Sequence, residues 1–347
     1  MKLRSIKNIN VKGKRVLLRV DFNVPVEKGK VEDDFRIKQT LPTINLLKKK
    51  GAKIILISHL TEGRAKSLKP MAKYLKVKFV KNKIPEMRNG EVIMLENIRN
   101  YPGEEKNDKN FAKKLASLGD IYVNEAFSVS HREHASIVGI SKYLPSYAGL
   151  LFEKELKNLQ SALKPRHPFL LILGGIKIKT KLGVLKRFLT IADKIFIGGA
   201  LAHNFFKVQG KDIGKSVFDP EVNVKKYLNN QKIILPIDVK IKNDAILDVG
   251  PKTIKNLSQI IKESKFILWN GPLGDFEKKG FEKGTLETAR AIAQSGAKSI
   301  IGGGDTIAAI RKAKIPLSQF SFVSTAGGSL LEFLAKGTLP GIKILEK

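Results

Sequence analysis

The sequence has 347 residues, 42% of them hydrophobic, and carries a formal net charge of +32 at pH 7. One hydrophobic core rarely serves a chain this long, so two domains are expected, and the apolar content excludes a largely disordered chain. The absence of cysteine excludes a disulfide scaffold and thiolate chemistry. No apolar run resembles a signal peptide or a membrane-spanning helix, so we expect a soluble protein of the cytoplasm.

The positive charge raises the alternative of a nucleic-acid-binding protein. Only 12 of the 64 basic residues are Arg, however, and the lysines are spread along the chain. The densest run, Lys48-Lys49-Lys50, falls at the end of a predicted helix, where cations are favourable. No basic arm, zinc-finger spacing or aromatic RNA-binding motif is present. We therefore favour a lysine-rich surface around a site for small polyanions, with no nucleic-acid or membrane partner.

Strand and helix patterns alternate through the first half of the chain. Strands are predicted at 16–20, 53–57, 92–95 and 121–123. Helices are predicted at 36–50, 68–75 and 108–117. This alternation is typical of a parallel sheet with helices on both faces.

A polar helix is predicted at 153–163, and the two prolines of Lys164-Pro165-Arg166-His167-Pro168 mark a boundary after it. The alternation then starts again. Strands are predicted at 169–173, 194–197, 232–235, 266–269, 299–301 and 320–323. Helices are predicted at 181–189, 201–208, 253–262, 281–295, 305–313 and 328–334. The sequence thus predicts an α/β protein of two doubly wound parallel-sheet, Rossmann-like domains joined by a linking helix.

Glycines follow several predicted strands of the second half. They are Gly174-Gly175, Gly198-Gly199, Gly271, Gly302-Gly303-Gly304 and Gly327-Gly328. Ligands of open α/β sheets bind beyond the carboxyl ends of the strands, and glycine lets backbone amides approach phosphate oxygens. One such group is often turn geometry alone, but five in one domain favour a nucleotide site.

Residues 209–216, Gln-Gly-Lys-Asp-Ile-Gly-Lys-Ser, resemble a phosphate-binding P-loop. The first glycine is one residue too close to Gly214-Lys215, and the segment follows a predicted helix rather than a strand. We interpret it as an ordinary loop. The first strand–helix turn carries no G-x-G-x-x-G fingerprint either.

Polar side chains gather where the predicted strands of the first half end. They are Asp21, Asn23, His59 and Arg99, with Arg36 and Arg132 in nearby loops or helix starts. Arginines converging on one sheet edge suit a small multivalent anion, although each alone is more often a surface ion-pair partner. His131 and His134 have a metal-like spacing, but no third ligand is apparent, so zinc is not expected.

Short motifs follow one another along the chain. They are Val20-Asp21-Phe22-Asn23-Val24-Pro25, Asp33-Asp34-Phe35-Arg36-Ile37, Ser58-His59-Leu60, the run from Leu95 to Glu105, Asn124-Glu125-Ala126-Phe127, His131-Arg132, Leu173-Gly174-Gly175-Ile176-Lys177, Trp269-Asn270-Gly271-Pro272-Leu273-Gly274, Gly302-Gly303-Gly304-Asp305-Thr306 and Leu339-Pro340-Gly341. Together they resemble the phosphoglycerate kinase family, in the family's order and over nearly the whole chain.

The resemblance implies a glycolytic and gluconeogenic enzyme that uses Mg²⁺. Its reaction is reversible phosphoryl transfer between 1,3-bisphosphoglycerate and ADP, giving 3-phosphoglycerate and ATP. It implies a monomer with a hinge and a central cleft. The implied parts are a 3-phosphoglycerate-binding domain at 1–152, a linking helix and boundary at 153–167, a nucleotide-binding domain at 168–334 and a C-terminal peptide at 335–347 that returns to the first domain.

The resemblance also implies the site residues. Those matching the 3-phosphoglycerate site are Asp21, Phe22, Asn23, Arg36, His59, Leu60, Arg99 and Arg132. Those matching the nucleotide site are Lys177, Lys181, Gly198, Gly199, Asn270, Pro272, Glu277, Gly303, Gly304, Asp305 and Thr306. Among these, Asp305 is implied to hold Mg²⁺ and Glu277 the ribose hydroxyls. Arg36 and Lys177 are implied to be catalytic, with the amides of Gly327 and Gly328 at the transition state. Where the family usually runs from His-Leu directly into Gly-Arg-Pro, Thr61-Glu62 here precede Gly63-Arg64.

The chemistry of the implied reaction agrees with the site residues that the resemblance implies. A carboxylate acceptor is already ionised at pH 7, so no general base is needed, and positioning and charge neutralisation carry catalysis. Two alternatives stay open: a nucleic-acid-binding protein on the same scaffold, and an inactive relative that binds nucleotide only. The choice between ATP and GTP also stays open.

Overall fold

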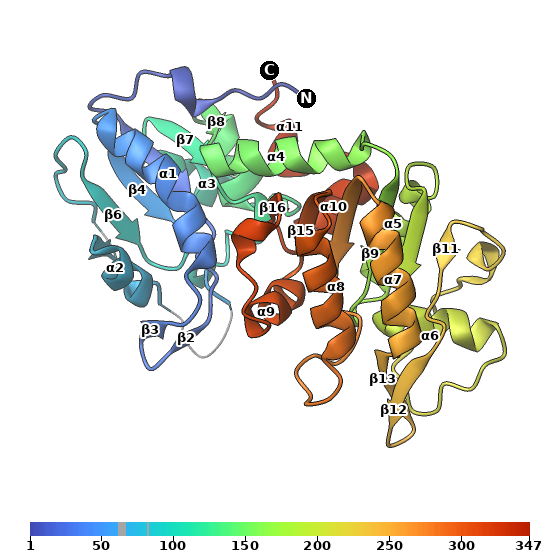
Figure 1. Ribbon diagram of the computed structural model, residues 1–347. Helices are drawn as coiled ribbons and strands as arrows, with labels where there is room; N and C mark the ends of the chain where they lie inside the picture. Colours follow the sequence, from blue (N-terminus) through green and yellow to red (C-terminus); the bar gives the residue numbers. More distant parts are fainter. Residues whose placement is uncertain (62–66, 82) are drawn as a thin grey trace. The chain divides into compact units, whose positions relative to one another are not determined.

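The computed structural model describes residues 1–61, 67–81 and 83–347 (Figure 1). The chain divides into two compact units. The first unit comprises Met1–Lys157 with Thr338–Lys347, and the second comprises Asn158–Gly337. The division falls inside helix α4 (Leu150–Leu163).

The first unit is built on a sheet of six parallel strands in the order β5-β6-β4-β1-β7-β8. The strands are β1 (Arg15–Arg19), β4 (Lys53–Ile57), β5 (Lys78–Val80), β6 (Val92–Leu95), β7 (Ile121–Asn124) and β8 (Ser146–Ala148). The helices are α1 (Phe35–Lys49), α2 (Lys69–Leu75), α3 (Lys109–Ala116) and α11 (Pro340–Lys343). The short helices are η1 (Ile6–Asn8), η2 (Ile98–Asn100), η3 (Phe127–Val129), η4 (Ala135–Gly139) and η5 (Ile140–Lys142).

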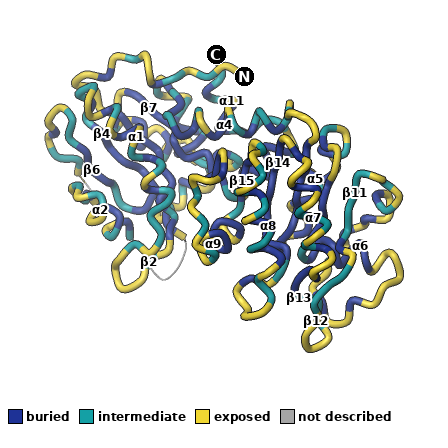
Figure 2. Tube along the Cα trace, in the orientation of Figure 1, coloured by how far each residue is buried: buried dark blue, intermediate teal, exposed yellow. Residues whose placement is uncertain are grey.

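Successive strand residues of the first sheet point to opposite faces, and each face has its own core. Val16 and Leu18 pack in a cluster that includes Ile37 of α1 and Met71 of α2. On the other face, the cluster that contains Leu17 takes its helical members from α3, η2 and η5. Since both faces are covered, the strands read as continuous apolar runs, which Figure 2 shows as buried.

The second unit repeats this plan with a sheet in the order β11-β10-β9-β14-β15-β16, again all parallel. The strands are β9 (Phe169–Leu173), β10 (Lys194–Ile197), β11 (Ile233–Ile234), β14 (Phe266–Asn270), β15 (Lys298–Gly302) and β16 (Phe322–Val323). The helices are α5 (Lys179–Phe188), α6 (Gly199–Val208), α7 (Pro251–Glu263), α8 (Lys283–Gln294), α9 (Gly304–Lys312) and α10 (Gly328–Lys336), with short η6 (Lys225–Tyr227) and η7 (Leu317–Gln319). In its core, Phe169 meets Phe188 and Phe266 edge to face.

The two six-stranded parallel sheets confirm the predicted α/β class. Several short elements were not predicted: the edge strands β5 and β8, and two hairpins outside the main sheets. The hairpins are β2 (Val26–Glu27) with β3 (Lys30–Val31), and β12 (Val239–Lys242) with β13 (Ala245–Val249). Strands β2, β3, β5 and β8 carry too few residues for a period-two pattern to stand out, and β13, Ala-Ile-Leu-Asp-Val, does not alternate apolar with polar residues.

Several predicted boundaries shift because tertiary contacts decide them. The linking helix begins at Leu150 rather than at 153, because the Glu125 carboxylate accepts hydrogen bonds from the Leu151 and Phe152 N–H groups at 3.0 and 3.1 Å. The predicted strands 232–235 and 320–323 shorten to two residues each at the edges of the second sheet. Residues 209–216 follow α6 as a loop, as predicted.

The last ten residues belong to the first unit. The Gly341 N–H donates to the Ser130 carbonyl at 2.8 Å, and the Arg4 N–H donates to the Leu345 carbonyl at 2.9 Å. A Cβ at Gly341 would lie 2.6 Å from Cβ of Ser130, so glycine is required for this close approach. The C-terminal segment is therefore held beside the segment that follows β7.

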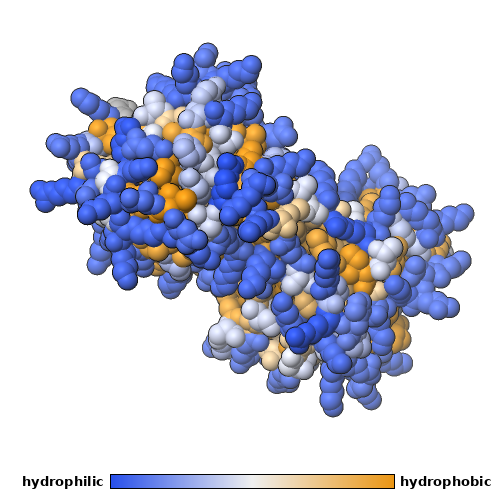
Figure 3. Space-filling model, turned by 90° about the horizontal axis from the view of Figure 1, so that it is seen from above, coloured by the Kyte–Doolittle hydropathy of each residue, from blue (hydrophilic) through white to orange (hydrophobic). Residues whose placement is uncertain are grey.

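Hydrophilic side chains dominate the face seen in Figure 3, with only scattered hydrophobic patches. This is consistent with the many lysines of the sequence. No helix in the described part of the chain combines the length and apolar character needed to cross a membrane.

Candidate active site

Each unit gathers candidate residues at the carboxyl edge of its own sheet. In the first unit Asp21 follows β1, His59 follows β4, Arg99 lies in η2 after β6, and Arg132 follows η3 after β7. These strands are neighbours in one parallel sheet, so their carboxyl ends share an edge. Arg36 joins them from the first turn of α1, where the Asp33 side chain accepts from the Phe35 N–H at 2.8 Å.

Asp21 organises the candidate residues of the first unit, which we call the first cluster. Its carboxylate pairs with Arg36, Oδ2 to Nη1 at 3.1 Å, and accepts hydrogen bonds from the Ser128 hydroxyl and the Asn23 N–H. Arg36 Nη1 also donates to the Asn23 carbonyl at 2.9 Å. Burial opposes ionisation, but Arg36 and the hydrogen bonds outweigh it and hold the pKa of Asp21 below its ordinary value. Asp21 is thus a fixed anion that orients Arg36.

His59 is buried and lies 4.0 Å from Asp21 and 3.3 Å from Arg19 Nη2, both measured from its Nδ1. Burial, with further contributions from Arg19 and Arg99, lowers the pKa of His59, so the ring is neutral at pH 7. Arg19 is itself fully buried and donates to Ser136 Oγ at 2.8 Å. The histidine therefore serves the cluster as a neutral hydrogen-bonding group.

The remaining residues of the first cluster differ in exposure. Arg132 is exposed, while Arg99 is half-buried with its Nε 3.3 Å from Glu105 Oε1. Phe22 and Leu60 bury their side chains in the core, and their N–H groups donate to Ser58 Oγ and Asn97 Oδ1. These two residues position their neighbours. Arg64, the arginine after the Thr61-Glu62 insertion, lies outside the described residues.

In the second unit, glycine lets backbone segments approach closely at the sheet edge. A Cβ on Gly174 would lie 2.2 Å from the Pro272 carbonyl oxygen, and one on Gly271 would lie 2.2 Å from that of Gly174. Gly271 also has φ of +95°, and Gly199 has φ of +56° with its Cβ position 2.5 Å from Gly175 N. No side chain fits at these points, so the ends of β9 and β14 and the start of α6 present bare backbone.

Three helices begin at glycines on this edge, α6 after Gly198, α9 after Gly303 and α10 after Gly327. Helix starts carry free N–H groups and the positive end of the helix dipole, which suit phosphate. Thr306 Oγ1 accepts from the Gly271 N–H at 2.8 Å and ties α9 to β14. Gly304 and Gly328 are exposed, whereas Asn270 at the end of β14 is buried.

Two lysines follow β9 in different environments. Lys177 is exposed, whereas Lys181 is buried in the first turn of α5 and donates from Nζ to the Lys177 carbonyl at 3.0 Å. Burial, and the charge of Lys177, lower the pKa of Lys181 to about 8. Lys181 is therefore mostly protonated at pH 7 and titrates near the physiological range.

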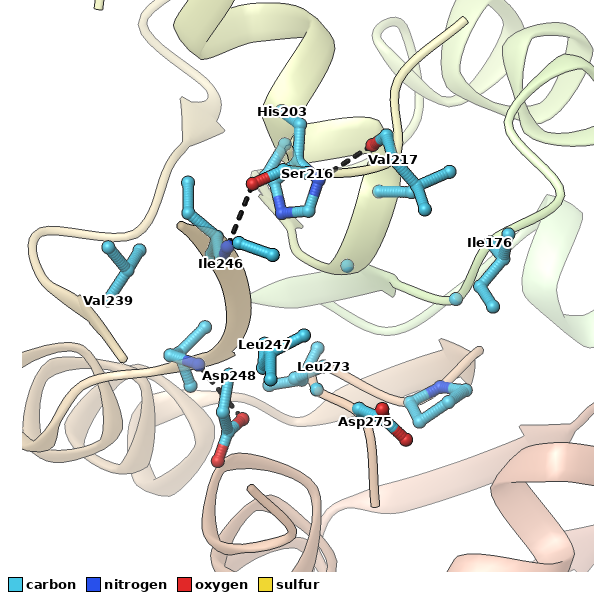
Figure 4. A pocket seen from close by; sticks show the side chains of 18 of the residues that line it. Ile176, His203, Ser216, Val217, Val239, Ile246, Leu247, Asp248, Leu273 and Asp275 are labelled. Atoms are coloured by element: carbon cyan, nitrogen blue, oxygen red, sulfur yellow. Dashed lines mark hydrogen bonds between the residues drawn. The ribbon is translucent and has the colours of Figure 1, made fainter. Parts of the chain in front are cut away.

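A pocket of about 380 Å³ opens in the second unit (Figure 4). Of the predicted nucleotide-site residues, Gly199, Pro272, Glu277 and Asp305 line it. The others are not part of its lining. They are Lys177, Lys181, Gly198, Asn270, Gly303, Gly304 and Thr306, with Gly327 and Gly328 of the predicted transition-state amides, and they lie at the ends of β9, β10, β14 and β15 or at the starts of α5, α9 and α10.

Much of the pocket wall was not among the predicted site residues. It comes from hairpin β12–β13, from the loop after α6 and from the middle of α6, represented by Ile246, Ser216 and His203. Ser216 Oγ accepts from the Ile246 N–H at 2.8 Å and so joins loop and hairpin. Asp248, also in the lining, accepts hydrogen bonds from the Gly284 and Val249 N–H groups, both at 2.9 Å. Burial raises the pKa of Asp248 to about 6. The mostly apolar run Ala245–Val249 was the available signal for a strand there.

Asp305 is the carboxylate that the sequence predicts to hold Mg²⁺, and Asp248, Asp275 and Glu277 line the same pocket. Within residues 1–61, 67–81 and 83–347, no three His, Asp or Glu side chains gather into a group that could hold a metal by itself. Asp305 is an exposed carboxylate in the first turn of α9 and lines the pocket. Mg²⁺ usually binds through one or two carboxylates together with substrate phosphates and water, so this single carboxylate fits a metal that arrives with a nucleotide.

The fold and the two edges together define a class. The chain is an α/β protein of two doubly wound units. One unit has a cluster of arginines at its sheet edge, and the other has a pocket partly lined by glycines. Such a pair of sites is typical of a small-molecule phosphotransferase. The phosphoglycerate kinase family model matches residues 6–337. The chain belongs to the phosphoglycerate kinase family.

Relatives and solved structures agree with this assignment. The chain is 43% identical to the phosphoglycerate kinase of Borrelia garinii subsp. bavariensis, with all of both chains covered. It is 43% identical to that of Leptospira biflexa, with 99% of this chain and 98% of the relative covered. The structure of phosphoglycerate kinase from Coxiella burnetii matches with a TM-score of 0.85 at 35% identity, and that from Pyrococcus horikoshii with 0.87 at 31%. Each match covers 99% of this chain and 98% of the other.

Proposed function

We propose that the chain carries out the reaction of its family with 3-phosphoglycerate on the first unit and the Mg·nucleotide on the second. The reaction is glycolytic phosphoryl transfer between 1,3-bisphosphoglycerate and ADP. The assignment of one substrate to each unit rests on the contrast between the carboxyl edges of the two sheets. In one, Asp21 fixes the direction of the cationic Arg36, and in the other, bare glycine backbone with Lys181 and Asp305 borders a pocket.

The first unit would bind a phosphorylated carboxylate through its arginines. Arg132 is exposed, and Arg36 is held by Asp21 in a fixed direction. Guanidinium groups grip phosphate and carboxylate in a bidentate manner. The neutral His59 and the Asn23 side chain would complete recognition, with Phe22 and Leu60 as supports.

The second unit would bind the nucleotide with its phosphates over the glycine-started helices. Lys181 and the N–H groups at the start of α9 suit the phosphates, and Glu277 of the pocket lining suits the ribose hydroxyls. Asp305 would hold the Mg²⁺, which neutralises phosphate charge when bound.

Catalysis would rest on orientation and charge. The acceptor carboxylate needs no base, so Arg36, Lys177 and the amides of Gly327 and Gly328 would neutralise the transferring group. Reaction requires the reacting atoms to come within about 3–3.5 Å of each other. Each substrate alone engages mainly one unit, so the two together should favour a more compact state. Small-angle scattering should give the smallest radius of gyration in the ternary sample, and equal radii in all samples would contradict this.

A coupled assay with 3-phosphoglycerate and Mg·ATP tests the function directly. We expect turnover that requires Mg²⁺ and both substrates and that is indifferent to added DNA or RNA. Nucleotide binding without turnover would favour the inactive-relative alternative. Tight binding of nucleic acid that falls steeply with salt, without turnover, would favour the nucleic-acid alternative.

We also propose that the enzyme acts as a monomer in the cytoplasm. A cysteine-free sequence suits a reducing compartment. Light scattering during gel filtration would test the monomer, and fractionation of cells would test the compartment.

A further inference from the structure

His203 lies in the middle of α6, with its ring in the wall of the pocket (Figure 4). The residue is only 7% exposed. Its Nδ1 is 2.7 Å from the Val217 carbonyl oxygen, which belongs to the loop after α6. A carbonyl oxygen can only accept, so Nδ1 must carry the hydrogen of this bond.

The other ring nitrogen, Nε2, has no hydrogen-bond partner in the described part of the chain. The other buried polar side chains of the lining, Ser216 and Asp248, are already bonded to backbone groups. Unlike them, Nε2 of His203 remains able to form a hydrogen bond with a ligand in the pocket.

The ring is neutral in this environment. Burial lowers the pKa of His203 below its ordinary value, against a smaller opposing effect of the Val217 hydrogen bond. A neutral imidazole with its hydrogen on Nδ1 carries a lone pair on Nε2. Nε2 is thus a hydrogen-bond acceptor.

Much of the pocket lining is apolar and suits a flat ring. Ile246, Leu247 and Leu273 line the same pocket, and Phe206 and Val239 extend the apolar wall. Apolar walls hold a planar base without reading its polar edge, so discrimination among bases falls to the few polar groups present.

We propose that His203 is the residue that selects the base of the nucleotide, by accepting a hydrogen bond at Nε2 from the amino group of a 6-aminopurine. This inference rests on the proposed nucleotide site of the second unit. A 6-oxopurine would set its own acceptor oxygen against the Nε2 lone pair. A purine without a 6-substituent would leave Nε2 unpaired.

Calorimetry on the unmodified protein tests the proposal with ADP, IDP and purine riboside diphosphate, each with Mg²⁺. ADP should bind about tenfold more tightly than either analogue, because each loses one hydrogen bond and leaves a buried acceptor without a donor. Affinities within about twofold of one another would overturn the proposal. This measurement needs no variant to fold.

Two variants separate base recognition from support of the loop. In His203→Asn the amide can still donate to the Val217 carbonyl but is too short to replace Nε2, so the ADP preference should fall to about twofold or less. Asn204→Ala is the matched control. Asn204 holds the same loop through the Asp219 and Val222 carbonyls, at 2.6 and 3.1 Å. Its ADP preference should be unchanged even if all affinities fall together.

An equal loss of preference in both variants would mean that loop order, not Nε2, reads the base, and would overturn the proposal. An unchanged preference in His203→Asn would overturn it as well. Failure of the proposed function has a different signature, because it is the absence of turnover with 3-phosphoglycerate. The ratio of diphosphate affinities is measured without turnover.

Discussion

The carboxyl edges of the two sheets are alike in topology and opposite in construction. In the first unit, the proposed binding groups are charged side chains, and a buried partner fixes the direction of one of them, as Asp21 does for Arg36. In the second, the absence of side chains is the main feature, as at Gly174 and Gly271, whose Cβ positions lie 2.2 Å from backbone oxygens. A substrate with a phosphate and a carboxylate needs forked cations, whereas a polyphosphate can use helix starts and a metal.

The comparison implies that substitutions at the two edges should have different effects on the protein. Truncating a side chain at the first edge should remove charge while leaving the packing of the backbone in place. Adding one methyl group at the second edge should disturb the fold itself, because backbone cannot move aside as a flexible side chain can. The four predictions below test this difference in order of expected effect.

Arg36→Ala should lower kcat by about 10²- to 10³-fold, the usual effect of removing one donor aimed at developing charge. The affinity for Mg·ADP should change little, because Arg36 belongs to the first cluster. Steady-state kinetics in the coupled assay, with calorimetry for the nucleotide, measure both quantities. An unchanged kcat would remove Arg36 from the catalytic group.

Gly271→Ala should lower the free energy of unfolding by about 2 kcal/mol or more, since overpacking typically costs about 1–3 kcal/mol and φ of +95° adds backbone strain. Gly304→Ala is the matched control for stability. A Cβ there meets nothing within 4 Å, and its unfolding free energy should stay within about 0.5 kcal/mol. Chemical denaturation measures both, and equal destabilisation of the two variants would refute the close-approach argument.

Asp305→Asn should raise the KM for Mg·ADP about tenfold, because a neutral amide is a weaker ligand for Mg²⁺ than a carboxylate. Binding of 3-phosphoglycerate, measured by calorimetry without nucleotide, should be nearly unaffected. A parallel loss of 3-phosphoglycerate affinity would contradict the assignment of one substrate to each unit.

Lys181 should make nucleotide use depend on pH in a range where the first cluster does not change. With its pKa lowered to about 8, it loses its charge as the pH rises, and kcat/KM for Mg·ADP should fall about fourfold between pH 7 and 8.5. In Lys181→Arg the charge persists, so this fall should disappear. A fall of equal size in that variant would assign the titration to another group.

The order of elements and the fold class were open to prediction because they depend on local patterns. The run Phe169–Leu173 is entirely apolar and becomes a strand buried on both faces, as parallel sheets require. The candidate residues at strand ends, such as Asp21, His59 and Asp305, could also be named in advance. They stand next to strongly patterned elements, and chain topology places all such ends on one edge.

Contacts between segments distant in the sequence decided the features that could not be predicted, such as the pocket wall and the start of α4. The pocket of the second unit takes His203 from mid-helix and Ile246 from a hairpin, and neither was among the predicted site residues. The start of α4 is set by Glu125, whose pKa burial raises to about 7. Sequence by itself determined which segments become strands and helices, because hydrophobic periodicity is a property of neighbours along the chain. Tertiary structure alone decided which polar atom is left unpaired in a pocket, because hydrogen-bond partners are neighbours in space.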